Sequence, residues 1–318
     1  MDEFYVVNKY SASYPPEVRI SKLFQWNAKG DFWRPHLFHQ TYQNPEASNP
    51  NVLGSIVPLW NDFGPNSTVY SEAYYAWRTA IPALADKQWG GNLTEEDFAS
   101  TFEALHPYVP GQNLDRAVPS KDKTIFNYTV TGARQEEVLR VLKDTSSNGY
   151  DATTDCATSK DGALQIGAGC SVVTPLSSKG RDYTFVLDLK ISELTTPTNA
   201  TLITGHDSAL MLTPALSYLA SGVYFRLSGN MTLATDTWTK VTVSGVKSRT
   251  FATLAPVDGP AVTEEFITVM DISGNYMQTG QMAIEAPLSR IGGVGSGWTG
   301  EVRGWSLTSE GWNLTNEG

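Results

Sequence analysis

The periodicity of the apolar residues changes once along the 318-residue chain, and this change limits the folds that the chain can adopt. Over residues 71–105 apolar side chains recur at helical spacing, whereas beyond residue 124 they form short runs of β-branched and aromatic residues. Residues 111–124 are polar and rich in turn formers, which is typical of an inter-domain linker. The sequence therefore predicts a multidomain protein, with an α/β unit in residues 1–110 and an all-β unit in residues 125–318.

Two segments of the first unit carry helix signals. Residues 71–89 repeat apolar side chains at helical spacing, and Gly90-Gly91 follows where a helix would end. Thr94 is a good capping residue, and Glu95-Glu96-Asp97 places acids in the first turn of a helix that continues to Leu105. We expect a helix over each segment.

The second unit consists of short strand-like runs separated by Gly, Ser, Asn and Pro turns. This pattern predicts an antiparallel β-sandwich. The clearest runs are residues 184–191, 222–227, 238–243 and 266–272.

A short apolar run in residues 52–59, opened by Asn-Pro-Asn, predicts a strand that is buried on both faces. Trp60 and Asp62 follow it directly. An aromatic ring can stack on the C–H face of a pyranose while a carboxylate accepts hydroxyls, so this pair is a candidate sugar subsite. Two structural roles compete with this interpretation: Trp60 as an aromatic residue at the rim of a sheet, and Asp62 as the N-cap of the next element.

Composition excludes several classes of partner. The net charge of −10 argues against nucleic acid, because phosphate binding needs clustered Lys and Arg. No stretch approaches the roughly 18 consecutive apolar residues of a membrane helix. The glycine-rich residues 292–297 lack the lysine that follows a phosphate-binding loop, which indicates turns. We expect no nucleic acid, no membrane, no cofactor and no metal site.

Sequons and cysteines favour an extracellular protein. Two cysteines, Cys156 and Cys170, lie in one polar, glycine-rich stretch whose spacing permits a local disulfide, with free thiols as the alternative. Asn-x-Ser/Thr sequons, which are candidate glycosylation sites, begin at Asn66, Asn92, Asn127, Asn199, Asn230 and Asn313. Together these features predict a secreted protein whose signal peptide is not in this sequence.

Residues 54–89 resemble the last β/α unit of glycoside hydrolase family 20, the β-N-acetylhexosaminidase and lacto-N-biosidase family. The eighth strand of that family ends in Trp-x-Glu, which is similar to Trp60-Asn61-Asp62. Its eighth helix carries Ala-Leu-Ala-Glu-x-x-Trp, and this chain has Ala83-Leu84-Ala85-Asp86-Lys87-Gln88-Trp89. Its seventh strand, Trp-Tyr-Leu-Asp, resembles Phe4-Tyr5-Val6-Val7. The resemblance implies a partial (β/α)8 barrel, consisting of the last two β/α units, in residues 1–110.

The resemblance also implies roles for individual residues. Trp60 would stack on the non-reducing sugar, Asp62 would bind its 4- and 6-hydroxyls, and Tyr5 would bind the acetamido group, although Val7 replaces the family's aspartate. Family 20 uses substrate-assisted catalysis with an Asp-Glu pair after the fourth strand, and no segment here matches that pair. The implied function is a C-terminal fragment of a secreted β-N-acetylhexosaminidase that is inactive alone, with no catalytic residue in this chain. The alternative is a non-catalytic, lectin-like glycan-binding or structural protein; in both cases the expected ligand is a glycan.

The C-terminal unit resembles laminin-G-like and concanavalin-type jelly rolls, which implies that residues 125–318 form an antiparallel jelly-roll β-sandwich. The segments that carry the resemblance are residues 144–151 (Asp-Thr-Ser-Ser-Asn-Gly-Tyr-Asp), 162–166, 290–293 and 297–302. Such domains accompany secreted glycosidases and bind glycans or pack against the catalytic domain.

Overall fold

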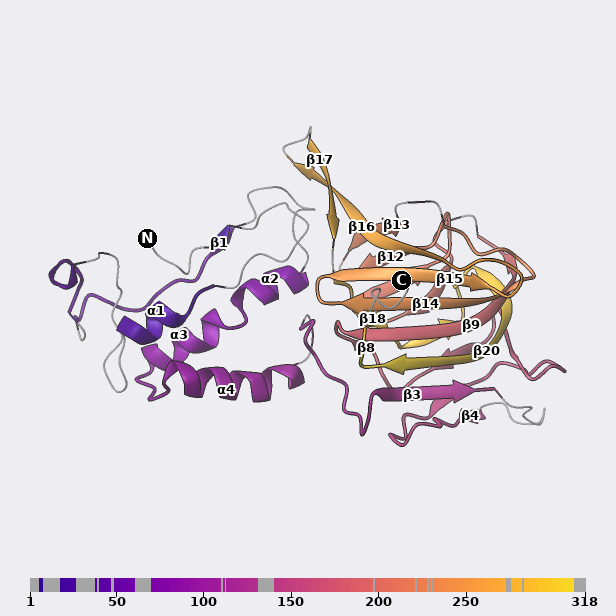
Figure 1. The fold of residues 1–318 in the computed structure, drawn as a ribbon, viewed down its shortest axis with the longest axis horizontal. Coiled ribbons are helices and arrows are strands. Elements are labelled where there is room, and N and C mark those ends of the chain that lie inside the picture. The colour runs from indigo at the N-terminus through magenta and orange to yellow at the C-terminus, as the bar shows by residue number, and fades with distance from the viewer. Residues whose placement is uncertain are drawn as a thin grey trace. The chain divides into compact units, whose positions relative to one another are not determined.

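The computed structural model divides into two compact units (Figure 1). One comprises Met1–Asn113 with Met270–Gln278, and the other comprises Leu114–Val269 with Thr279–Gly318. The structure describes residues 6–7, 18–26, 38, 40–46, 49–60, 70–109, 111, 113–130, 140–196, 198–220, 222–227, 229, 231–272, 276–281 and 283–311.

The first unit is built mainly from short helices. Helix α4 begins at Thr94 in a capping box: Thr94 Oγ1 accepts the N–H of Asp97, and Asp97 Oδ2 accepts the N–H of Thr94, which confirms the predicted start of this helix. The elements are β1 (Val6–Val7), α1 (Ser21–Trp26), η1 (Thr41–Gln43), β2 (Leu59–Trp60), α2 (Tyr70–Trp77), α3 (Ala80–Gln88), α4 (Glu95–Leu105) and η2 (His106–Tyr108).

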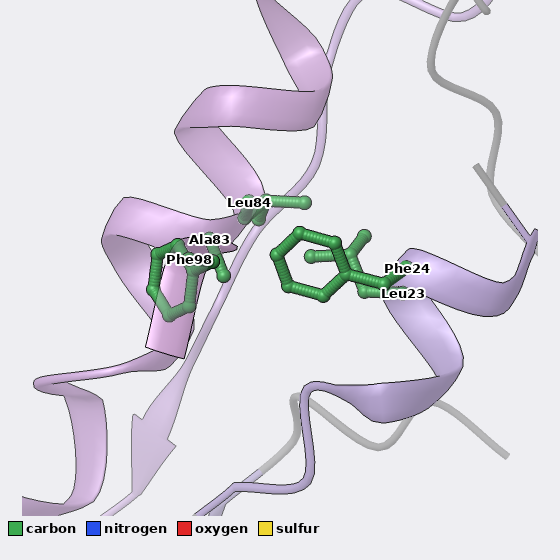
Figure 2. Close-up of a cluster of buried hydrophobic side chains, with 5 residues drawn as sticks. All are labelled: Leu23, Phe24, Ala83, Leu84 and Phe98. Carbon is green, nitrogen blue, oxygen red and sulfur yellow. The ribbon is translucent and has the colours of Figure 1, made fainter. Parts of the chain in front are cut away.

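Among the described residues of this unit, side chains from three helices form a buried core cluster. Leu23 and Phe24 of α1 face Ala83 and Leu84 of α3 and Phe98 of α4 (Figure 2), and the rings of Phe24 and Phe98 lie 5.4 Å apart. These five side chains form one buried cluster. Four partly buried hydrophobic side chains pack against this cluster, namely Ile20, Val57, Leu93 and Phe102.

The predicted partial (β/α)8 barrel is wrong, because the protein is mostly antiparallel β structure. In the part of the chain that the structure describes, the expected barrel strands are limited to β1 and β2, which pair in parallel over two residues each, Val6 with Leu59 and Val7 with Trp60. The apolar run before Leu59 is irregular, and Leu53 and Ile56 are 96% and 79% exposed. A strand can bury both faces only between covering layers, and although Val57 packs against the buried cluster of the first unit, Leu53 and Ile56 stay exposed.

The second unit is a β-sandwich. One sheet has the order β3-β20-β9-β14-β15-β16 and the other β13-β12-β11-β10-β19-β7-β5-β4, and β16 links the sheets by pairing with both β15 and β13. The strands are β3 (Thr124–Thr129), β4 (Arg140–Leu142), β5 (Ala152–Thr154), β6 (Leu164–Ile166), β7 (Ser171–Val173), β8 (Ser178–Lys179), β9 (Tyr183–Leu194), β10 (Thr201–Thr204), β11 (Ser208–Met211), β12 (Ser217–Ala220), β13 (Val223–Leu227), β14 (Trp238–Val246), β15 (Arg249–Pro256), β16 (Val262–Ile272), β17 (Tyr276–Gln281), β18 (Ala286–Pro287), β19 (Arg290–Gly292) and β20 (Trp298–Thr308).

Alternation along β9 separates the core from the solvated face. Phe185, Leu187 and Leu189 are buried between the sheets, whereas Val186 and Asp188 face outward. This is the pattern of an antiparallel strand with one face in the core. The outer face of the β3-β20-β9-β14 sheet is therefore a largely polar surface, and the strands fix the positions of its side chains.

Asp144 connects the edge strand β3 to the loop that follows β4. Its carboxylate accepts the backbone N–H groups of Asn127 (3.0 Å), Ser146 (2.9 Å) and Tyr150 (3.0 Å), and the hydroxyl of Ser146 (2.7 Å). Burial alone would raise the pKa of Asp144, but these hydrogen bonds hold it below its ordinary value. The segment that resembles laminin-G-like domains is thus organised around one carboxylate.

Three further contacts secure the sandwich. Cys156 and Cys170 form a disulfide, which confirms their expected pairing. The first residues of this unit also bind its body: Leu114 O accepts the N–H of Arg181 (2.6 Å), and Arg116 pairs with Glu285 (3.2 Å).

Candidate functional site

A groove of about 380 Å³, lined by both polar and apolar residues, opens on the outer face of the sandwich, where β20 changes its pairing partner from β6 to β3. Gly300 to Val302 pair with β6, and Gly304 to Thr308 pair with β3. The change of partner leaves a depression at the junction. The polar side chains that line it are Asn127, Thr129, Asp161, Asp188, Arg303 and Ser306.

Arg303 occupies a β-bulge at the middle of the groove. Val302 pairs with Leu189 and Gly304 pairs with Asp188, so Arg303 is an extra residue in β20. Glu301 and Arg303 alternate with buried Val302, so the guanidinium lies on the outer face of the sheet. The extra residue shifts the alternation after Arg303, so that Trp305, and not Gly304, is the next buried residue.

Two neighbours fix the Arg303 side chain. Its Nε donates to Asp188 Oδ2 at 2.6 Å, and its guanidinium carbon lies 4.4 Å from the ring centre of Trp238. Lys190 approaches the same ring at 5.4 Å. An exposed ion pair contributes little to folding stability, but the ring and the carboxylate together hold the planar guanidinium in one orientation.

Asn127 stands opposite Ser306 on the neighbouring strand. Its side-chain Nδ2 donates to Thr145 Oγ1 at 2.9 Å, and Thr145 Oγ1 donates back to the carbonyl oxygen of Asn127 at 2.8 Å. The backbone N–H of Asn127 is bonded to Asp144. Asn127 is consequently a rigid part of the groove wall.

The groove combines donors and acceptors with little net charge. Arg303 and Asp188 compensate each other, and Asp161 adds one carboxylate at the rim. Carboxylates accept hydrogen bonds, the guanidinium donates them, and the Asn127 amide does both. Such a set suits a neutral ligand with several hydroxyl groups better than an anion.

The predicted sugar subsite belongs to the first unit, whereas this groove belongs to the second. Trp60 ends β2 in the first unit and is 49% exposed, whereas Tyr5 and Asp62 lie outside the described residues. Our prediction also missed Arg303 and Asp188. Their signal in the sequence is a break in alternation, because two residues separate the apolar Val302 from Trp305 where one would keep the strand period.

The described sequons differ in exposure. Asn92 and Asn199 are exposed, and Asn127 is half-buried in the groove wall. Asn66, Asn230 and Asn313 lie outside the described residues.

Within the described ranges, one group of residues has the spacing of metal ligands, namely Asp155, Cys156 and Cys170. Both of these sulfur atoms belong to the disulfide, so neither is a thiolate ligand. No helix among the described residues is long and apolar enough to cross a membrane.

A second cavity, of about 500 Å³, lies among the helices of the first unit. Trp77, Ile81 and Leu105 give it mainly apolar walls, and the ring of His106 is buried against Phe102 at 4.5 Å. It presents few of the polar groups that orient a polar ligand. The groove beside Arg303 is therefore the better candidate site.

Comparison with known proteins identified no matching family model and no matching curated protein. Among solved structures, the chain is similar to a Trypanosoma rangeli sialidase in complex with sialic acid (14% identity, 69% of this chain and 37% of that chain, TM-score 0.34). It is also similar to the binding domain of botulinum neurotoxin serotype D (12%, 60% and 49%, TM-score 0.36). Domain 4 of AbnA, a family 43 extracellular arabinanase from Geobacillus stearothermophilus, in complex with arabinotriose, matches at 15% identity over 61% of this chain and 95% of that domain, with a TM-score of 0.39. The chain spans less than two thirds of the sialidase and toxin chains, and we transfer no function from these similarities.

Proposed function

We propose that the β-sandwich is a non-catalytic glycan-binding module and that the groove beside Arg303 is its ligand site. The observation that carries the proposal is the orientation of Arg303. Its guanidinium is fixed by Asp188 and Trp238 in a cavity whose other polar groups are an amide, hydroxyls and a carboxylate.

The hydrogen-bonding groups of the groove match those of a sugar. Neighbouring hydroxyls of a pyranose can accept from the two Nη groups of Arg303 and donate to Asp188 or Asp161. Because the guanidinium is already oriented, binding costs little side-chain entropy. Trp238 lies beside two cations, so it acts here as a support for Arg303 rather than as an open stacking platform.

Glycan-array screening of the full chain, followed by calorimetry with the best neutral oligosaccharide, tests this proposal. We expect Arg303→Ala and Asp188→Asn to weaken binding at least about tenfold, which corresponds to about 1.4 kcal/mol. Arg249→Ala is a matched control, because Arg249 forms a similar group with Glu265 (Nε–Oε1 2.8 Å) and Phe251 (4.7 Å), and none of these three lines the groove. Absence of binding, or equal affinity of the Arg303 and Arg249 variants, would reject the proposal.

The resemblance to family 20 stays a prediction, since no comparison tests it. It implies an enzyme whose acid and orienting aspartate are not matched in this chain. We therefore expect the purified protein not to hydrolyse an aryl N-acetylglucosaminide, and detectable turnover would contradict the non-catalytic assignment.

A further inference from the structure

We infer that Asn127 is an N-glycosylation site whose own glycan occupies the groove beside Arg303. The covalent glycan then competes with external ligands. This inference rests on the proposed function, and on the predicted secretion that would expose the chain to the glycosylating enzyme. The glycan on Asn127 would then regulate how well the groove binds external ligands.

The position of Asn127 is the first observation. Asn127 lines the groove, and it faces Ser306 across the β3–β20 pair, two residue pairs away from Gly304. Thr129, the third residue of the sequon, is exposed on the same rim. A sugar attached here begins inside the groove.

The hydrogen bonds of Asn127 are compatible with the modification. The side-chain amide has two hydrogens, and the bond to Thr145 Oγ1 uses one of them. In glycosylation, Nδ2 forms a bond to C1 of N-acetylglucosamine, the C1–O bond to a lipid-linked pyrophosphate breaks, the pyrophosphate leaves and Nδ2 loses one proton. The remaining N–H can keep its bond to Thr145, so the folded strand does not have to rearrange.

Tethering makes this sugar a strong competitor. A ligand joined by a short link reaches an effective concentration on the order of millimolar or more. The polar groups that suit an external sugar, Arg303 and Asp188, are then already engaged. A glycan on Asn92 or Asn199 has no such effect, because neither residue lines the groove.

Release of the glycan from the native protein tests this inference without any external ligand. The full chain is secreted from a eukaryotic cell, and mass spectrometry measures occupancy at each sequon and the rate at which peptide N-glycosidase removes each glycan. We expect the Asn127 glycan to be released at least tenfold more slowly than the Asn199 glycan. Arg303→Ala should accelerate release of the Asn127 glycan severalfold, and Arg249→Ala should not. If the glycan were released slowly only because its attachment point is buried, Arg303→Ala would not change the rate.

Ligand binding provides the second readout. Fractions of the same secreted protein with and without the Asn127 glycan are compared by calorimetry, and we expect at least fivefold weaker binding of the glycosylated fraction. An unmodified Asn127, release that does not respond to Arg303→Ala, or equal affinities of the two fractions would overturn the inference. If neither fraction binds any glycan while release at Asn127 still depends on Arg303, the groove holds its own glycan and the proposed binding of external glycans is what fails.

Discussion

Arg303 and Asp188 are 115 residues apart in the sequence, yet Arg303 Nε lies 2.6 Å from Asp188 Oδ2 on the outer face of the sandwich. Antiparallel pairing of β20 with β9 brings the two strands together, and both side chains lie on outward positions of their strands. The Trp238 ring supports the guanidinium from the next strand. Three strands thus cooperate to orient one cation.

Replacing Arg303 by Lys tests whether orientation or charge matters in the groove. Lysine keeps the positive charge but lacks the planar fork that pairs with Asp188 and stacks on Trp238. We expect Arg303→Lys to lose about tenfold in glycan affinity by calorimetry, with a change in unfolding free energy within about 0.5 kcal/mol, because the side chain is exposed. Full affinity in this variant would show that charge alone is sufficient.

Local patterns made parts of this fold predictable. The run at residues 184–191 alternates along β9, and the capping sequence at Thr94 begins α4 as expected. The alternation of side chains along a strand and the capping of N–H groups at a helix start both depend on residues that are close together in the sequence. A sequence pattern of a few residues therefore contains each signal. The two cysteines were predictable for a similar reason, since 14 residues separate them.

The failures arose where distant partners decide the structure. The apolar run before Leu59 has the composition of a buried strand, but burial requires covering elements that composition cannot reveal. The family pattern at Trp60 led to the wrong barrel for this reason. The ion pair of Arg303 with Asp188 depends on strand register over 115 residues, and only the broken alternation at Arg303 could have indicated the bulge.

Asp144→Asn should destabilise the sandwich in a pH-dependent way. The asparagine keeps the shape but loses the charge that strengthens the bonds from Asn127, Ser146 and Tyr150, so we expect a loss of about 1–3 kcal/mol at pH 7. Because the folded pKa of Asp144 is lowered, its contribution is fully present above the unfolded pKa of about 3.9 and is lost as pH falls through the folded pKa.

Urea unfolding of both proteins from pH 3 to pH 7 measures this difference. The gap between wild type and Asp144→Asn should narrow below about pH 4, the range in which the unfolded carboxyl takes up its proton. Asp161→Asn is the control, because Asp161 is exposed at the groove rim and accepts none of the backbone bonds that organise the 144–151 loop. A gap that stays constant with pH would contradict the role of the Asp144 charge.

The disulfide between Cys156 and Cys170 should stabilise the sandwich mainly by restricting its unfolded state. For a closed loop of this length the chain-entropy model gives about 3 kcal/mol. We expect the Cys156→Ser/Cys170→Ser protein to unfold at a correspondingly lower denaturant concentration. Reductant should lower the denaturant midpoint of the wild-type protein to that of the serine variant, and it should not change the midpoint of the variant. A wild-type midpoint that does not respond to reductant would refute this prediction.

Lys179 should make the sandwich more stable as pH rises above 8. The side chain is 7% exposed, and burial lowers its pKa to about 8, with Arg116 and Arg181 adding to the effect and Asp182 opposing it. Its Nζ donates to the carbonyls of Gly180 (3.2 Å) and Arg181 (2.7 Å), two bonds that a neutral amine can also make.

The sign of the effect follows from proton binding. Between pH 8 and about 10.4 the unfolded state holds a proton on Lys179 that the folded state has lost, so stability increases with pH by at most about 1.4 kcal/mol per unit. Lys179→Met removes this dependence, and the stability of wild type relative to the variant should therefore rise from pH 8 to pH 10 in urea unfolding. Taking the difference cancels the titration of groups that both proteins share. Lys240→Met, at an exposed position on β14, should show no such rise, and a flat difference for Lys179→Met would mean that the buried amine keeps its proton.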